Sequence, residues 1–224
     1  YNKRKAEEFL EEYGGSRAIG HIRYGTSGPE GEEFIQPFEL FDPRKDKWFA
    51  FCFNGNICNV SELRKELESK EYIEHKNDTE IFAANIAMLI ASLDGRDGFA
   101  EIFEHVARKF DGSYSFAMID AYGRMVFGRD SFGNRPLFYA EDERMFAVAS
   151  EDVALVEGLK FNRNRVKVIE PGHIVTYNEA GKVEISKFAG AGKRAHCIFE
   201  LVYLMHPESS IEGTGVQVAS FRYN

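Results

Sequence analysis

The chain has 224 residues with 28 Lys or Arg and 36 Asp or Glu, so its formal net charge at pH 7 is -8. This length suits one sizeable domain, and a hydrophobic fraction of 44% supports a buried core and excludes intrinsic disorder. The acidic balance argues against a nucleic-acid partner, and no apolar run approaches the roughly 20 residues needed to span a membrane. The three cysteines lack CxxC spacing, and their odd number excludes a fully paired disulfide framework and favours a reducing, cytoplasmic location.

The first half of the chain is predicted to run from a short helix through strands to a group of helices. Apolar periodicity predicts, in chain order, a helix over 5–13, strands over 18–24, 34–41 and 48–53, and helices over 60–72, 78–93 and 99–110. The Asp42-Pro43 turn predicts that the second and third strands form a hairpin. Asn54-Gly55-Asn56 is expected to end the third strand, because Asn and Gly disfavour regular strands.

The second half is predicted to consist mainly of strands separated by Gly, Asp and Asn turns. Strands are expected over 113–120, 125–128, 136–140, 145–150, 166–169, 173–178, 182–188 and 197–204, with one short helix over 151–158. Strands, then helices, then many strands are typical of an α+β domain with layered sheets. Small residues from 189 to 193 mark a boundary, which divides the chain into a domain over 1–190 and a following segment over 191–224.

Polar groups follow several predicted strands, where binding and catalytic residues are often found. An Arg grips a carboxylate in bidentate fashion, an Asp pairs with an amine, and an Asn amide and a Gly N–H donate to an oxyanion. Arg23, Asp78 and Asn54-Gly55 are therefore candidates for recognising an amino acid. Spacing alone does not bring them together. A rim salt bridge, a helix N-cap and a tight turn are the ordinary structural explanations of the same residues.

Four segments of the first half resemble motifs of the class II glutamine amidotransferases. They are GHIRYGTSG over 20–28, QPF over 36–38, NGNICN over 54–59 and NDTE over 77–80. The family motifs are GH-x-RY-x-T-x-G, QPF, HNGN-x-x-N and SD[ST]E, so Phe53 stands where the family has His. Five later segments narrow the resemblance to the amidophosphoribosyltransferase family: GRDSFGNRPL over 128–137, VASE over 148–151, PG over 171–172, CIFELVYL over 197–204 and HPES over 206–209.

The resemblance implies an N-terminal-nucleophile hydrolase fold, a four-layer αββα sandwich that here lacks its first strands. Residues 1–190 would form the glutamine amidotransferase domain. The residue roles it implies are Arg23 for the glutamine carboxylate, Asp78 for its amine, Asn54 and Gly55 for the oxyanion hole, and Tyr24 and Thr26 for the pocket. The implied activity is hydrolysis of glutamine to glutamate and ammonia through a γ-glutamyl thioester. The ammonia would form phosphoribosylamine in purine synthesis, which is a glycosyltransferase reaction.

Two departures leave open whether the chain is itself an enzyme. The family's nucleophile is an N-terminal Cys, but none of the 19 residues before Gly20 is a cysteine. Cys52, Cys58 and Cys197 lack a free α-amine and are expected to be structural. The segment over 191–224 is expected to lead toward a phosphoribosyltransferase domain that this sequence does not contain.

Three functional hypotheses remain from the sequence. The first is the glutaminase part of an amidophosphoribosyltransferase, incomplete at both ends, and the second is an inactive homologue that binds a metabolite or regulates another subunit. The third is a purely structural fragment. The expected partners are glutamine, a phosphoribosyltransferase domain or subunit, and further copies of the chain in a homo-oligomer. No metal or other cofactor is expected, because the His and Cys residues lack the spacing of metal or iron–sulfur ligands.

Overall fold

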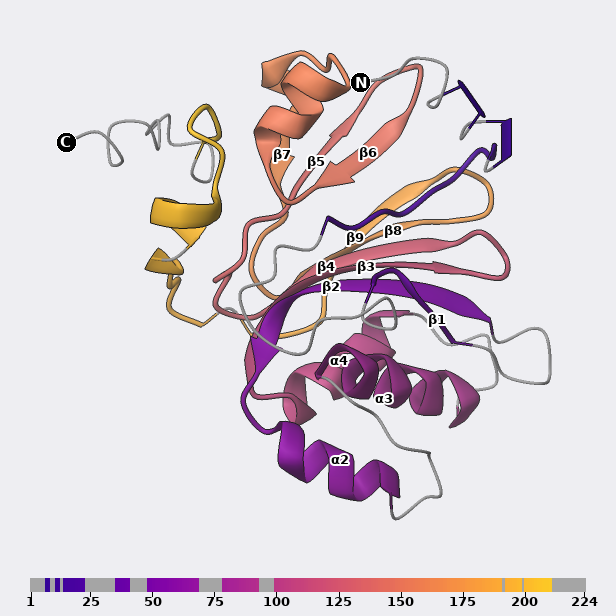
Figure 1. The fold of residues 1–224 in the computed structure, drawn as a ribbon, viewed down its shortest axis with the longest axis vertical. Helices are drawn as coiled ribbons and strands as arrows, with labels where there is room; N and C mark the ends of the chain where they lie inside the picture. Colours follow the sequence, from indigo (N-terminus) through magenta and orange to yellow (C-terminus); the bar gives the residue numbers. More distant parts are fainter. Residues whose placement is uncertain are drawn as a thin grey trace.

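A computed structural model describes residues 7–8, 11–12, 14–22, 35–40, 48–68, 78–92, 99–190, 192–198 and 200–210. It has two antiparallel sheets that lie face to face, with a layer of helices on the outer side of the larger sheet (Figure 1). The α+β sandwich predicted from the sequence is therefore confirmed. Within the described part of the chain, no helix is long and apolar enough to cross a membrane.

The larger sheet contains six strands in the order β1-β2-β3-β4-β8-β9, and all neighbours are antiparallel. Their bounds are β1 Phe38–Leu40, β2 Phe49–Ile57, β3 Gly112–Asp120, β4 Met125–Arg129, β8 His173–Tyr177 and β9 Val183–Lys187. The predicted hairpin of the second and third strands is confirmed, because β1 and β2 pair in antiparallel register from Phe38↔Phe51 to Leu40↔Phe49. The longest ladder joins β2 to β3 and builds the centre of the molecule.

The helices pack on one face of this sheet because its strands turn alternate aromatic side chains toward them. The three helices are α2 Val60–Glu68, α3 Asp78–Ser92 and α4 Phe99–Lys109. Phe82 of α3 lies at the centre of the contact, with its ring centroid 5.3 Å from those of both Phe51 and Phe53. Phe103 of α4 stacks on Phe116 of β3 at 4.3 Å. These rings form the main core of the protein.

The smaller sheet has the order β6-β5-β7 and covers the other face of the larger sheet. Its strands are β5 Phe138–Glu141, β6 Phe146–Ala149 and β7 Lys167–Val168, and a 3-10 helix, η3 Arg163–Arg165, precedes β7. Between the sheets lies a second core that includes Phe127, Leu137, Ile169 and Val175. On the outer side, Phe138 and Ala140 pack against Leu155 of the π-helix η2, Ala154–Gly158.

Three local predictions from the sequence were wrong. Asn54-Gly55-Asn56 does not end the sheet, because β2 continues to Ile57 in register with β3. Of the predicted strand over 18–24, the described residues 18–22 are in no strand, and residues 23–24 lie outside the described part. The predicted strand over 197–204 is instead a π-helix, η4 Glu200–Leu204, closed by a bond from Met205 N–H to Glu200 O at 2.8 Å.

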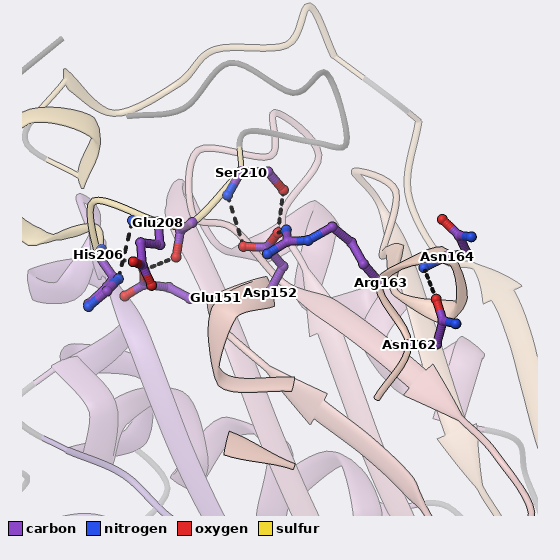
Figure 2. A network of polar contacts seen from close by, with 9 residues as sticks. Glu151, Asp152, Asn162, Arg163, Asn164, His206, Glu208 and Ser210 are labelled. Carbon is purple, nitrogen blue, oxygen red and sulfur yellow. Dashed lines mark hydrogen bonds and ion pairs between the residues drawn. The ribbon is translucent and has the colours of Figure 1, made fainter. Parts of the chain in front are cut away.

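The segment after residue 190 folds back onto the sheets. Glu200 of η4 forms an ion pair with Arg135 at 2.5 Å. The following residues are held by two neighbouring carboxylates after β6 (Figure 2): Glu151 accepts from His206 N–H at 2.6 Å, and Asp152 accepts from Ser210 N–H at 2.9 Å. The division of the chain near residue 190 stays a prediction, since these contacts do not test it.

Candidate active site

The candidate oxyanion residues lie at the end of β2, where the ladder with β3 places them in different environments. In an antiparallel ladder, residues alternate between pairs that exchange backbone hydrogen bonds and pairs that do not. Tyr114, the partner of Gly55, turns both backbone groups away from β2: its N–H donates to Asp130 Oδ2 at 3.1 Å, and its C=O accepts from Asp130 N–H at 2.9 Å. Gly55 and Tyr114 are thus a pair without mutual backbone hydrogen bonds.

The Gly55 N–H consequently points to the opposite edge of β2. On that edge β1 pairs only as far as Phe51, so Gly55 lies beyond the end of the paired stretch. Two residues earlier, Phe53 N–H points to the same side and donates to the side-chain oxygen of Gln36 at 2.7 Å. Among the described residues, no strand pairs with β2 at the level of Gly55 on this edge. The Gly55 N–H thus points away from β3, at an edge of β2 where the described residues supply no pairing strand.

Only glycine fits at position 55 without moving the neighbouring strand. A Cβ atom there would lie 2.2 Å from the carbonyl oxygen of Ser113 and 2.8 Å from the Cα of Tyr114. Both are backbone atoms, and pairs without mutual hydrogen bonds have the shorter Cα separation. The strand therefore continues through Asn54-Gly55-Asn56 because the glycine permits the close approach of β3.

Asn54 and Phe53 point to opposite faces of the larger sheet. Phe53 is buried on the helix side, where its ring lies 6.3 Å from that of Tyr114. It occupies the position of the family's His but belongs to the aromatic core. Asn54 is half-buried and shares the other face, toward the smaller sheet, with Cys52 two residues earlier. Its cross-strand partners on this face are Ser115 and then Arg129.

Arg129 and Asp130 form a buried elbow where the chain leaves the larger sheet for the smaller one. The Arg129 guanidinium donates to the carbonyl oxygens of Gly133, Arg135 and Ile169 at 2.6 to 2.9 Å. The Asp130 carboxylate accepts from the N–H groups of Tyr114, Phe132 and Gly133. Burial raises the pKa of Asp130, while these N–H donors and Arg129 act in the opposite direction.

The motif over 128–137 contains Arg129 and Asp130, but it does not indicate what these two side chains do. The structure gives both side chains a larger role. They form hydrogen bonds with backbone groups of the elbow, and Asp130 also accepts from Tyr114 N–H near the start of β3. The signal in the sequence was a charged pair placed between an apolar strand and a Gly-containing turn. Gly133 in that turn has a φ of +65°, a conformation that favours glycine.

The other candidate residues are placed only in part. Arg23, Tyr24 and Thr26 lie outside the described residues. Asp78 is the first residue of α3, as predicted, but its side chain is also outside the described part. Phe82, one helical turn later, contacts Phe53 on β2. The structure therefore brings Asn54 and Gly55 together but does not test their combination with Arg23 and Asp78.

None of the cysteines has the surroundings of an activated nucleophile. Cys52 is buried beside the carbonyl of Gly20, and this burial raises the pKa of its thiol to about 11. A thiol with a raised pKa carries little of the reactive thiolate at neutral pH. Cys58 is exposed in the turn after β2, and Cys197 is half-buried in the stretch after residue 190. In the described part of the chain, no group of His, Cys, Asp or Glu is arranged to hold a metal ion.

Comparison with known proteins decides the family. The family model described as a glutamine amidotransferase domain matches residues 29–157, which include β1 to β6, the candidate oxyanion residues and the Arg129-Asp130 elbow. The chain belongs to the glutamine amidotransferase domain family.

Individual relatives of this amidotransferase domain extend the likeness to nearly the whole chain. The amidophosphoribosyltransferase of Archaeoglobus fulgidus is 32% identical over 218 residues, covering 95% of this chain and 45% of the relative. The amidophosphoribosyltransferase of Bacillus subtilis is 31% identical over 94% of this chain and 42% of its own length. The chain thus spans less than half the length of the curated relatives it matches.

Solved structures agree with the family and the fold. The glutamine phosphoribosylpyrophosphate amidotransferase of B. subtilis, complexed with ADP and GMP, superposes with a TM-score of 0.72 at 26% identity. It covers 89% of this chain, which corresponds to 40% of that structure. A structure described as the allosteric regulatory enzyme of purine biosynthesis gives a TM-score of 0.73 at 27% identity, with the same coverage. The resemblance to an amidophosphoribosyltransferase glutamine amidotransferase domain is confirmed, and so is the expected N-terminal-nucleophile hydrolase type of fold.

Proposed function

We propose that this chain is the glutamine-binding and glutaminase part of an amidophosphoribosyltransferase. Its product ammonia would be used to form phosphoribosylamine in purine synthesis. The observation that carries the proposal is the orientation of the Gly55 N–H, which the β2–β3 register directs to an edge of β2 beyond its pairing with β1. A fixed backbone donor of this kind costs no reorganisation when negative charge develops near it.

The proposed mechanism assigns each candidate residue one step. Arg23 binds the α-carboxylate of glutamine and Asp78 its α-amine, which aligns the side-chain amide with the end of β2. Tyr24 and Thr26 line the pocket around the bound amino acid.

The chemical step needs a thiolate, which attacks the amide carbon of glutamine. The Asn54 side-chain amide and the Gly55 N–H donate to the oxyanion that forms, an interaction typically worth about 10²- to 10³-fold in rate per donor. When the C–N bond breaks, the nitrogen takes up a proton and leaves as ammonia. Water then hydrolyses the thioester to glutamate. The nucleophile is expected to be an N-terminal cysteine supplied by a segment that the present sequence does not include.

A second candidate function is an inactive homologue that binds a metabolite for regulation. The observation that favours it is Phe53, which replaces the family's His and is committed to the core through Phe82 and Tyr114. The candidate oxyanion donors Asn54 and Gly55 favour the glutaminase function instead, because regulation alone does not require them.

Calorimetric titration of this chain with L-glutamine tests the pocket. We expect binding that Arg23→Ala removes, because the α-carboxylate loses its partner. Arg144→Ala is the matched control, since Arg144 pairs with Asp142 on the exposed β5–β6 turn and should leave binding unchanged. Absence of glutamine binding by the unmodified chain, shown to be folded by circular dichroism, would overturn the proposal.

Activity is tested in the longer protein that carries the N-terminal segment. Ammonia release from glutamine, coupled to glutamate dehydrogenase, supports the glutaminase function. Glutamine binding without ammonia release supports the regulatory one. We also propose a phosphoribosyltransferase domain or subunit and further copies of the chain as partners. Sedimentation equilibrium of the longer protein tests the homo-oligomer.

A further inference from the structure

One side chain joins four elements at the end of β2. Asn59 lies in the turn between β2 and α2, directly before the first residue of α2. Its Nδ2 donates to the carbonyl oxygen of Lys109 at 2.9 Å, and its Oδ1 accepts from Asp111 N–H at 3.1 Å. These two bonds fix the turn to the last residue of α4 and to the connection that leads into β3.

Backbone bonds complete the same junction. The carbonyl oxygen of Asn59 accepts from the N–H groups of Glu62 and Leu63, so Asn59 also opens α2. The preceding residue, Cys58, donates its N–H to the carbonyl oxygen of Asp111 at 2.7 Å. The polypeptide after β2 is thus held on both sides, by the start of α2 and by the α4–β3 connection.

Gly55 forms no backbone bond across the ladder itself, so the orientation of its N–H depends on the residues around it and on the junction in which they end. The residues on either side, Asn54 and Asn56, are the ones whose backbone groups face β3, opposite Ser115 and Ser113. Gly55 lacks a bond across the ladder, and β1 ends its pairing at Phe51. Beyond Gly55 the ladder continues through Asn56 and Ile57 to the bond from Cys58 N–H to Asp111 O, so Gly55 is held through its neighbours in the chain. The first side-chain anchor beyond Gly55 is Asn59.

We propose that Asn59 is a positioning residue for the candidate oxyanion hole. It does not touch glutamine; by fixing the turn after β2, it fixes the direction in which the Gly55 N–H points. This inference rests on the proposed function, since it concerns the donor that would face the side-chain carbonyl of glutamine. A displacement of a few tenths of an ångström and a tilt of the N–H weaken such a bond, because hydrogen bonds depend strongly on angle.

The test compares two ligands that differ at the group facing Gly55. L-glutamine and L-norvaline share the α-carboxylate and α-amine, but norvaline has no side-chain carbonyl to accept from Gly55. Because norvaline carries a methyl group in place of the whole side-chain amide, the ratio of their dissociation constants reports the contacts of that amide, the carbonyl contact with Gly55 among them. We expect the unmodified chain to bind glutamine more tightly, and Asn59→Ala to lower that preference by roughly five- to tenfold, the worth of one hydrogen bond. Norvaline affinity should stay unchanged.

A second variant separates positioning from folding. Asn59→Asp keeps the acceptor for Asp111 N–H and is a favourable residue before a helix, but it loses the donor to the Lys109 carbonyl. We expect this variant to melt near the unmodified temperature and still to lose glutamine preference. Asn178→Ala is the matched control: the Asn178 side chain likewise accepts from a turn N–H, that of Lys182, at 2.9 Å in the β8–β9 connection. It should change neither affinity.

The outcomes distinguish this inference from the proposed function. Full glutamine preference in a folded Asn59→Asp or Asn59→Ala chain overturns the positioning role and leaves the proposed function standing. Equal loss of both ligands also overturns it, because the pocket as a whole would then have changed. If the unmodified chain itself does not prefer glutamine over norvaline, the carbonyl contact is absent. This result would contradict both the role of Gly55 as an oxyanion donor and the role of Asn59 in positioning it.

Discussion

At the residue scale, the thiol closest to the candidate oxyanion donors is kept unreactive by burial. Cys52 lies two residues before Asn54 on the same strand and faces the same side of the sheet. Only 6% of its surface is exposed, and desolvation raises the pKa of the thiol to about 11. A cysteine near a catalytic motif is therefore not by itself a candidate nucleophile, and its neutral form contributes to the core.

We predict that Cys52 resists alkylation by iodoacetamide at pH 8 in the folded chain, whereas the exposed Cys58 reacts. The same shift predicts a pH dependence of stability. The pKa of the Cys52 thiol in the folded chain lies above its unfolded value near 9. The contribution of the neutral thiol to the free energy of unfolding is therefore fully present below pH 9 and is lost as the pH rises through about 11. The loss amounts to about 2 to 3 kcal/mol. Peptide mapping after labelling checks the first part, and urea unfolding at pH 8 and 11, with and without Cys52→Ala, checks the second. Rapid native labelling of Cys52 would contradict the prediction.

Gly55 gives a second prediction at the residue scale. Gly55→Ala is expected to lower the free energy of unfolding by about 1 to 3 kcal/mol, because the new Cβ meets backbone atoms of Ser113 and Tyr114 that cannot rotate away. Urea unfolding measures the change. Gly158→Ala is the control: no atom lies within 4 Å of its added Cβ, so stability should be unchanged or slightly higher. Equal midpoints for the two variants would show that β3 shifts freely, contrary to the close-packed ladder.

At the scale of elements, one lysine connects the three helices that cover the larger sheet. Lys109 is the last residue of α4, and its Nζ lies 2.7 Å from Asn85 Oδ1 on α3 and 2.7 Å from Glu66 Oε2 on α2. Asn85 is fully buried and uses its Nδ2 on the carbonyl of Ile81. The ammonium therefore supplies the partner that the buried amide oxygen needs.

Lys109→Met tests this connection, because Met keeps an unbranched apolar side chain of similar shape and removes the ammonium group. We expect a loss of about 1 to 3 kcal/mol in unfolding free energy, the cost of leaving the buried oxygen of Asn85 unpaired. Chemical unfolding measures it. Lys65→Met on the exposed side of α2 is the matched control and should be neutral. If the double variant Lys109→Met with Asn85→Leu is as unstable as Lys109→Met alone, the unpaired oxygen is not the cause.

The strands and helices also show which parts of the fold the sequence patterns predict. Strands bounded by Gly and Asp turns, such as β3 and β4, were predicted to within one or two residues, because turn chemistry and alternation agree there. The run over 197–204 was assigned to the wrong element, since a short apolar run fits a strand and a helix equally well. Its structure depends on Arg135, 65 residues earlier, which pairs with Glu200.

The candidate site likewise contains features that the sequence predicts and features that it does not. Asn54 and Gly55 were predicted from their place after a strand and then from a family motif, but neither observation indicates that they remain inside a strand. That depends on the glycine and on the β2–β3 register. The bonds of Asn59 to Lys109 and Asp111 span about 50 residues of sequence, and no local pattern indicates them.

At the scale of the whole molecule, the segment after residue 190 is fastened to the β4–β5 turn and to the residues that follow β6. Near its start, Gly192 N–H donates to Ser131 O at 2.8 Å, on the turn that leads from β4 to β5. Further on, Glu200 pairs with Arg135 at the end of that turn. Figure 2 shows the last contacts, in which Asp152 accepts from both the N–H and the hydroxyl of Ser210 and also pairs with Arg163. The segment is thereby fastened at several separate points.

The Arg135–Glu200 pair is the contact on which this arrangement is expected to depend most. The two side chains are 16% and 8% exposed, and removing one partner of a buried ion pair leaves an uncompensated charge, which typically costs about 3 to 5 kcal/mol. Glu200→Gln should therefore release the segment before the sheets unfold. Hydrogen exchange measures this at two amides of the segment: Met205 N–H, which donates to Glu200 O within η4, and Ser210 N–H, which donates to Asp152.

We expect those amides to exchange at least tenfold faster in Glu200→Gln, while amides of the β2–β3 ladder keep their rates, since local opening leaves the core intact. Glu184→Gln is the control, because Glu184 forms an exposed pair with Lys182 on β9 and should alter neither set. If the exchange of the ladder amides accelerated equally, the segment would unfold together with the core and would not be a separately docked part of the chain. Unchanged exchange at Met205 and Ser210 would mean that the carboxylates of Glu151 and Asp152 hold the segment without the ion pair.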